Sequence, residues 1–216
     1  NTLTAEQLGS LSTARLAALS TTQLNSMSSD DLLALSTQQV RGLTTTQLAG
    51  LSTDTLNTLT TAQFAALSTR QIAALGTDQV AALESADLMA LSTAQLRGLG
   101  LGAVAALDST DLGVLTSLQL RSLSSAQLRA IDTADINGIS GDNLATLSSA
   151  QISMLTSAQL AALGTDQLQS LGSAQLRGLT TLQLSQLGTE DLNALTSAQF
   201  GMLSRSEERR VGKECR

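Results

Sequence analysis

One octad, Leu155-Thr156-Ser157-Ala158-Gln159-Leu160-Ala161-Ala162, recurs with small changes along the chain, and Leu163 begins its next copy. Apolar residues fall at every multiple of eight from Leu8 to Phe200, and a second apolar series lies three residues after each of them. About 25 octads therefore run in unbroken register. This internal repetition is the strongest feature of the sequence, and the fold is predicted from it.

The polar residues between the two apolar series are typical of a helix start. In the copy Leu67-Ser68-Thr69-Arg70-Gln71-Ile72, Ser68 suits the N-cap and Gln71 falls at the third helical position, N3. These two side chains can form a capping box, in which each satisfies one backbone N–H at the helix start. Leu67 and Ile72 flank the cap as a hydrophobic staple. Each octad is therefore predicted to begin a new helix.

Two other backbone conformations fit the repeat poorly. Eight residues at about 100° each rotate the apolar stripe by roughly 80° per octad, so one continuous helix could not bury a single face. A strand would place the two apolar series on opposite faces, because their positions differ in parity. A helix of one to two turns is unstable alone, so neighbouring octads must pack on it. The predicted fold is all-α, a solenoid or superhelix of short capped helices with one helix per eight-residue repeat.

The two positions before each new leucine carry different kinds of residue. The position just after the multiple of eight is expected to face water, because it carries Arg41, Arg97, Arg121, Arg129 and Arg177. The next position is nearly always small, so backbones are expected to approach closely there, at Ala18, Gly42, Ala74, Gly98 and Ala162.

Two stretches depart from the consensus. Gly100-Leu101-Gly102-Ala103-Val104 lacks the cap residue and the N3 glutamine, and a weaker or irregular helix, or a bend, is expected there. Ile139-Ser140-Gly141-Asp142-Asn143-Leu144 keeps serine at the cap. Its Asp and Asn provide too few alternating oxygen ligands for a calcium loop, so a capped turn is expected.

Acidic residues occur in pairs that resemble catalytic carboxylates but fall at cap, N2 or N3 positions. Negative charge in the first helical turn complements the helix dipole, which explains them without catalysis. The pairs are Asp30 with Asp31, Glu84 with Asp87, Asp108 with Asp111, Asp132 with Asp135, and Glu190 with Asp191.

The predicted domain organisation is an octapeptide array over residues 1–204 followed by a non-native tail over residues 205–216. The chain enters the pattern at Asn1 without an initiator Met or a leader, so it is expected to be a fragment of a longer protein. The last twelve residues break the period and resemble a translated sequencing adapter, and we exclude them from the prediction of fold and function. No apolar run approaches the length of about 18 residues that a membrane span needs.

Composition excludes most chemistry. Five of the 12 basic and three of the 18 acidic residues lie in the tail, which leaves 7 Arg against 15 Asp and Glu, a net charge of −8. The array has no His, Cys, Lys, Pro, Trp or Tyr. It therefore lacks an imidazole, a thiolate and an ordinary zinc site, and no serine has a recognisable activating base. We expect no catalytic, cofactor-binding or metal-binding residues, no cofactor, and no enzymatic activity.

The repeat, as in Leu91-Ser92-Thr93-Ala94-Gln95-Leu96, resembles the LSTAQLAA-type octapeptide arrays of giant bacterial surface or secreted proteins, often labelled adhesin or haem-utilisation proteins. The resemblance covers about residues 3 to 204. It implies a non-catalytic structural segment at the cell surface or outside the cell, acting as an elongated spacer or adhesion scaffold. Host or cell-surface ligands, or self-association through uncapped ends, are the partners it implies. The haem label has no support here, because no His or Tyr can act as an axial ligand and Cys215 lies in the excluded tail.

The residues also bear on two other functions, nucleic-acid binding and the binding of ice or a glycan. The repeat is also similar to transcription-activator-like effector repeats, which pair a capped helix start with Gln and an apolar residue. Those repeats are longer and basic, whereas this array is acidic, so no nucleic-acid partner is expected. The alternative to a spacer is a ligand-binding surface, for ice or a glycan, formed by the threonines that recur at the first helical position, N1: Thr13, Thr21, Thr37, Thr45, Thr53, Thr61, Thr69 and Thr77.

Overall fold

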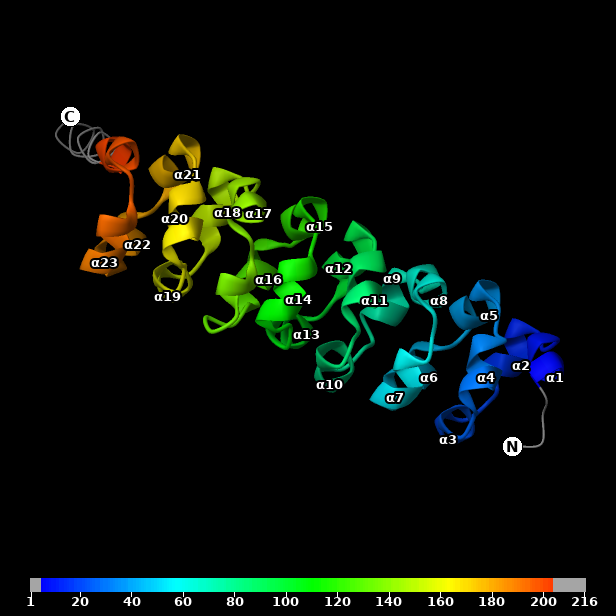
Figure 1. Cartoon of the computed structure of the whole chain (residues 1–216). Coiled ribbons are helices and arrows are strands. Elements are labelled where there is room, and N and C mark those ends of the chain that lie inside the picture. The colour runs from blue at the N-terminus through cyan, green and yellow to red at the C-terminus, as the bar shows by residue number, and fades with distance from the viewer. Residues whose placement is uncertain (1–4, 204–216) are drawn as a thin grey trace, which may run out of the picture. The chain divides into compact units, whose positions relative to one another are not determined.

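The computed structural model describes residues 5–203 of the chain. The predicted tail, residues 205–216, lies outside the described residues. The chain divides into two compact units, residues 1–107 and 108–216, each of which is a coil of short helices (Figure 1). Within the described residues, every octad except one forms an α-helix, and there is no strand. The predicted all-α solenoid with one helix per octad is confirmed.

The helices of the first unit are α1 (Ala5–Gly9), α2 (Thr13–Ala17), α3 (Thr21–Asn25), α4 (Ser29–Leu33), α5 (Thr37–Arg41), α6 (Thr45–Ala49), α7 (Thr53–Asn57), α8 (Thr61–Ala66), α9 (Thr69–Ile72), α10 (Thr77–Ala81), α11 (Ser85–Ala90), α12 (Thr93–Gly98) and α13 (Leu101–Ala105). Those of the second unit are α14 (Ser109–Val114), α15 (Ser117–Ser122), α16 (Ser125–Ala130), the 3-10 helix η1 (Ile136–Gly138), α17 (Gly141–Ala145), α18 (Ser149–Met154), α19 (Ser157–Ala161), α20 (Thr165–Ser170), α21 (Ser173–Gly178), α22 (Thr181–Gln186) and α23 (Thr189–Ala194). Residues 197–203 are also helical.

The helix starts are capped as the sequence predicts. Ser68 Oγ accepts the Gln71 backbone N–H at 3.3 Å, and Gln71 Oε1 accepts the Ser68 backbone N–H at 2.8 Å. Where glycine replaces the hydroxyl residue, half of the box survives, because the Gly76 N–H donates to Gln79 Oε1 at 2.9 Å. The predicted capping box is therefore confirmed, and its glutamine half does not depend on a side chain at the N-cap.

Each helix packs against the helix of the third following octad. In the first unit α5 packs on α8, α8 on α11, and α10 on α13; in the second unit α17 packs on α20 and α18 on α21 (Figure 1). Hydrogen bonds between turns join residues 25 to 31 positions apart, such as Asn25 to Gly50, and Gln71 to Leu43 and Val40. One superhelical turn in each unit therefore takes between three and four octads.

The two apolar series form the core. Side chains at multiples of eight are almost fully buried, and those three residues later are 1 to 9% exposed over most of the array. Leu48, Phe64, Ile72 and Leu112 are 0% exposed, whereas Phe200, in the last described octad, is 53% exposed. Burial therefore comes from packing between octads and not from the two or fewer turns of one short helix.

The small positions bring the turns close together, as expected. A Cβ added to Gly42 would lie 2.6 Å from Thr13 Cβ, and one added to Gly98 would lie 2.7 Å from Thr69 Cγ2. Arginines at the preceding position are exposed, including Arg41 and Arg97. Both positional predictions are confirmed.

The predicted irregularity at Gly100–Val104 is wrong. This stretch forms α13, which begins at Leu101; its N-cap residue Gly100 provides no side-chain cap, but the Val104 N–H donates to the Gly100 carbonyl at 3.0 Å. Ala103 and Val104 are buried, so core packing maintains the helix without the cap. The capped turn expected after Ile139 is confirmed, since Ser140 Oγ accepts the Asn143 N–H at 3.2 Å at the start of α17.

The irregular octad lies elsewhere, at residues 132–138. Asp132 Oδ1 accepts the Ala134 N–H at 2.9 Å, which stabilises a turn and does not start an α-helix. The octad ends in the 3-10 helix η1. Asp135 Oδ1 accepts the Ser109 N–H of an earlier turn at 3.1 Å, so this carboxylate is not available for a capping box. A Cβ at Gly138 would overlap the Ser109 carbonyl. Contacts between turns therefore override the local helix signal here.

Candidate functional site

The most distinctive polar feature is a column of buried N3 glutamines, which we call the glutamine ladder. In each of them the side-chain Nε2 donates to backbone carbonyls at the end of the helix four octads earlier. Members in the first unit are Gln39, Gln47, Gln63, Gln71, Gln79 and Gln95. Members in the second unit are Gln159, Gln167, Gln175, Gln183 and Gln199.

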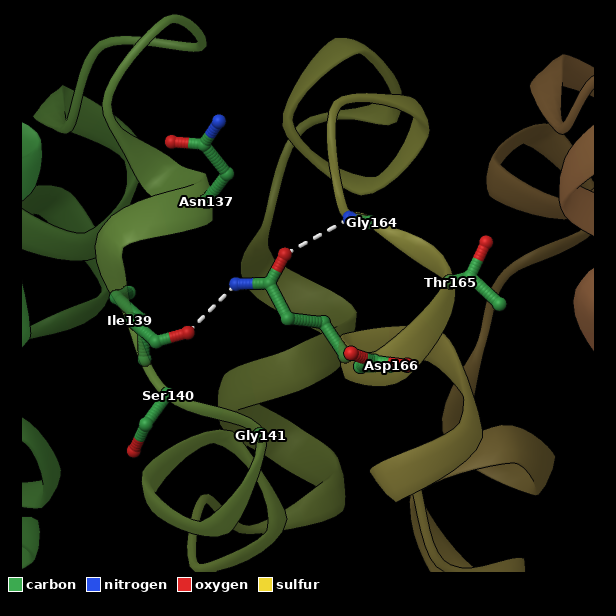
Figure 2. Close-up of a pocket in the computed structure, with 8 residues that line it drawn as sticks. Asn137, Ile139, Ser140, Gly141, Gly164, Thr165 and Asp166 are labelled. Atoms are coloured by element: carbon green, nitrogen blue, oxygen red, sulfur yellow. Dashed lines mark hydrogen bonds between the residues drawn. The ribbon is translucent and has the colours of Figure 1, made fainter.

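Each ladder amide links two helix termini. Gln167 Nε2 donates to the carbonyls of Ile139 at 2.6 Å and Ile136 at 3.2 Å, while its Oε1 accepts the Gly164 N–H at 2.8 Å. Figure 2 shows the central amide between the Ile139 carbonyl on one side and Gly164 on the other. The last carbonyls and first N–H groups of short helices have no partner within the helix. One side chain thus satisfies groups at both kinds of terminus.

The sequence carried a sign of the ladder that the capping-box interpretation did not use. Glutamate serves as well as glutamine at N3 of a capping box, yet Glu never occurs at N3 in this array, whereas Gln is the commonest residue there. Only the amide has a donor for a second partner. The preference for Gln over Glu at N3 is therefore explained by the carbonyl oxygens that the amide meets, although Asp occupies N3 in five octads.

Cap hydroxyls are occupied by the same boxes. Ser92 Oγ accepts the Gln95 N–H at 3.3 Å and donates to Gln95 Oε1 at 2.7 Å. Ser68 and Ser36 make the same two contacts with Gln71 and Gln39. A nucleophilic serine needs a base that accepts its proton, and here the proton is directed to an amide oxygen.

Three of the described acidic residues are buried, Asp31, Asp87 and Asp111, and the last two have a raised pKa. Asp87 is 3% exposed and Asp111 is 7% exposed, and burial raises the pKa of both carboxyls above the ordinary value of 3.8. A hydrogen bond from Thr61 opposes the rise in the pKa of Asp87, and the charge of Glu84 adds to it. Both aspartates occupy N3, the ladder position.

Some of the acidic pairs have the cap geometry that the sequence predicts and others do not. Asp108 and Asp111 form a reciprocal box, with Asp111 N–H to Asp108 Oδ1 at 2.9 Å and Asp108 N–H to Asp111 Oδ2 at 3.2 Å. Glu84 occupies an N-cap but makes no side-chain cap bond. Over residues 5–203 no three His, Cys, Asp or Glu side chains lie close enough together to hold a metal ion.

The N1 threonines do not form one uniform exposed row. Thr13, Thr21 and Thr53 are half-buried, whereas Thr37, Thr45, Thr61, Thr69 and Thr77 are exposed. The methyl groups of Thr13 and Thr21 fill the space beside Gly42 and Gly50 of a neighbouring turn. Part of the row therefore serves packing between turns.

Shallow open grooves lie between successive turns. One of about 380 Å³ is lined by Asn137 and Ser140 on one side of the ladder bond and by Thr165 and Asp166 on the other (Figure 2). Another of about 470 Å³ is lined by Arg41, Arg70 and the last two residues of α8, Ala65 and Ala66. None of the described helices is both long enough and apolar enough to cross a bilayer.

A sequence model of the ALTTAQ repeat matches six segments, residues 26–61, 56–84, 80–117, 104–140, 139–173 and 168–205. Together they cover the chain without a gap from residue 26 to residue 205. Each matched segment is 29 to 38 residues long, which is close to the 28-to-31-residue span of the ladder bonds. No curated protein matches the chain.

Proposed function

Because the chain belongs to the ALTTAQ repeat family, we propose that it is a non-catalytic structural segment of a bacterial extracellular or cell-surface protein, acting as an elongated spacer or adhesion scaffold. The observation that carries the proposal is the glutamine ladder, which within each unit joins the octads of its member glutamines to octads four repeats earlier. The surface or secreted location rests on the resemblance to octapeptide arrays of giant bacterial proteins.

The ladder suits a spacer because its members repeat the same bonds from one octad to another. Gln71 bonds to Val40 and Leu43, and Gln79 bonds to the matching carbonyls of Leu48 and Leu51. Adding an octad therefore adds the same set of contacts again and requires no new core. A segment of this kind becomes longer when octads are added, while its cross-section stays the same.

The non-catalytic part of the proposal is supported by the occupied hydroxyls. The cap serines Ser68 and Ser92 already donate to glutamine oxygens at 2.8 and 2.7 Å. Hydrolase activity in the purified chain that disappears on substitution of one of these serines by Ala would overturn it, provided that the circular dichroism spectrum of the variant is unchanged.

Small-angle scattering on a length series tests the spacer role. The full chain is compared with versions in which residues 68–99, four octads, are duplicated once or twice. A spacer predicts a radius of gyration that rises almost linearly with added octads at constant cross-section. Growth as about the 0.38 power of chain length, as for a compact globule, would contradict it.

The alternative is an ice-binding or glycan-binding surface formed by the N1 threonines. The exposed members, Thr37, Thr45, Thr61, Thr69 and Thr77, are the part of the row that a ligand can reach. Replacing these five by Ser keeps the helix start but removes five methyl groups. Loss of ice or glycan binding with retained helicity would support the alternative, and unchanged binding would remove it.

A further inference from the structure

We infer that the groove between Arg41 and Arg70 in the first unit binds a sugar that carries a sulfate or carboxylate group. The groove has a volume of about 470 Å³ and is lined by both arginines, by the alanines Ala65 and Ala66, and by the cap serines Ser68 and Ser92. This site is additional to the spacer role, which stands whether or not the groove binds a ligand.

Two arginines in one groove are unusual for this chain. The array is acidic, and Arg70 is the only arginine at the N2 position of any octad. Arg41 ends α5 and Arg70 lies in α9, so the groove joins two successive turns of the coil. Both side chains are exposed, and neither guanidinium group bonds to a described residue.

The two serines and the glutamine of the groove already have partners, whereas the exposed Thr69 hydroxyl has none among the described residues. Ser68 Oγ and Ser92 Oγ donate to Gln71 Oε1 and Gln95 Oε1, at 2.8 and 2.7 Å. Gln95 Nε2 donates to the carbonyls of Ala65 at 3.2 Å and Leu67 at 2.7 Å. The unused side-chain donors are therefore the two guanidinium groups and the Thr69 hydroxyl, and the positive charge of the guanidinium groups favours an anionic acceptor.

The ligand class follows from the shape and charge of the groove. A guanidinium fork matches the paired oxygens of a carboxylate or sulfate group. A free anion would leave most of the 470 Å³ and the Ala65–Ala66 wall uncontacted. A sugar ring presents C–H groups to such an apolar wall and carries the acidic group to the arginines.

The second unit contains a matched groove for comparison. Eleven octads after Arg41, Arg129 lines a groove with Met154 and Leu182, which are 43% and 66% exposed. The residue equivalent to Arg70 is Ala158, and Ala65 and Ala66 correspond to Ser153 and Met154, so this groove has one arginine and lacks the alanine wall. It is not expected to hold an acidic sugar, and Arg129 provides the control substitution.

The test is isothermal titration calorimetry of the full chain at low ionic strength with three probes: a sulfated uronate-containing disaccharide, sodium sulfate and maltose. We expect the acidic disaccharide to bind more tightly than sulfate and maltose not to bind. Arg41→Gln and Arg70→Gln should each weaken binding about tenfold or more, because each removes a charge-assisted hydrogen bond. Arg129→Gln should leave binding unchanged.

Three results would overturn the inference. The first is no detectable binding of the acidic disaccharide by the full chain. The second is equal affinity for sulfate and the disaccharide, which would leave an anion site with no sugar selectivity. The third is equal weakening by Arg41→Gln and Arg129→Gln, which would indicate non-specific attraction to surface charge. All three arginines are exposed, and matching circular dichroism spectra confirm that the variants are folded.

Discussion

Gln71 Nε2 donates to the carbonyl of Leu43, 28 residues earlier, at a distance of 2.8 Å. The same amide reaches the carbonyl of Val40 at 3.1 Å, and its oxygen accepts the Ser68 N–H at 2.8 Å. Gln71 is 3% exposed. A single buried side chain therefore satisfies backbone carbonyls at the end of α5 and a backbone N–H at the start of α9. The same linkage recurs at the other ladder glutamines.

Replacing Gln71 by Glu should destabilise the chain. Glutamate retains an acceptor for the Ser68 N–H but has no donor for the carbonyls of Val40 and Leu43, and it buries a charge beside them. We expect a loss of about 2 kcal/mol or more in unfolding free energy. Urea denaturation followed by circular dichroism measures it.

Gln38→Glu is the matched control, because Gln38 lies at the exposed N2 position of α5. That substitution should change the unfolding free energy by less than about 0.5 kcal/mol. If Gln71→Glu and Gln38→Glu have the same effect, the ladder does not stabilise the fold.

Gly138→Ala should be destabilising and Gly100→Ala should not. A Cβ at Gly138 would overlap the Ser109 carbonyl, so the two turns must move apart, at a cost of about 1–3 kcal/mol. A Cβ at Gly100 meets nothing within 4 Å, and its φ of −66° suits alanine. That change should be neutral or stabilising by up to about 1 kcal/mol. Thermal unfolding of both variants gives the comparison, and the reverse order of stability would refute the packing at Gly138.

Asp87→Gln should stabilise the chain at neutral pH. Asp87 is buried at a ladder position but has no amide donor for the carbonyls of Leu56 and Leu59, which lie 31 and 28 residues before it. Glutamine supplies that donor and removes a buried carboxylate. The expected gain is about 1 kcal/mol, measured by urea denaturation. A loss of stability would mean that the Thr61–Asp87 hydrogen bond matters more than the missing donor.

The same substitution should change the dependence of stability on pH. The pKa of Asp87 is raised in the folded chain, so the unfolded chain loses this proton first as the pH rises. The contribution of Asp87 to stability is therefore greatest below 3.8, falls as the pH rises from there through the raised pKa, and is constant above it. Denaturation at acid and neutral pH should show a smaller difference in Asp87→Gln than in the parent chain, and an unchanged difference would contradict this assignment.

The sequence predicted the features that depend on neighbours within one octad. The Ser68–Gln71 box, the buried apolar series and the exposed arginines all follow from spacing within eight residues. The second role of Gln71 could not be predicted in the same way, because its partner Leu43 is 28 residues away. Which carbonyls it meets depends on the number of octads per turn, and that number is set by packing between helices.

The two stretches whose structure differs from the local prediction also depend on contacts between turns. Gly100 lacks a side-chain cap, yet α13 forms because Val104 and Leu107 are buried. The pair Asp132 and Asp135 resembles Asp108 and Asp111 in sequence, but Asp135 bonds to Ser109 of another turn and the octad forms no α-helix. In both cases contacts between turns, which local propensity does not describe, determine the outcome.

The most direct test of the ladder is the hydrogen-exchange rate of glutamine side-chain amides, measured by NMR on the full chain. Gln71 Nε2 protons are predicted to exchange far more slowly than those of exposed Gln38 and to show nuclear Overhauser contacts to the Gly42–Leu43 backbone. Equal exchange rates for Gln71 and Gln38, with no contacts to Gly42 or Leu43, would contradict the account of how the octads are joined.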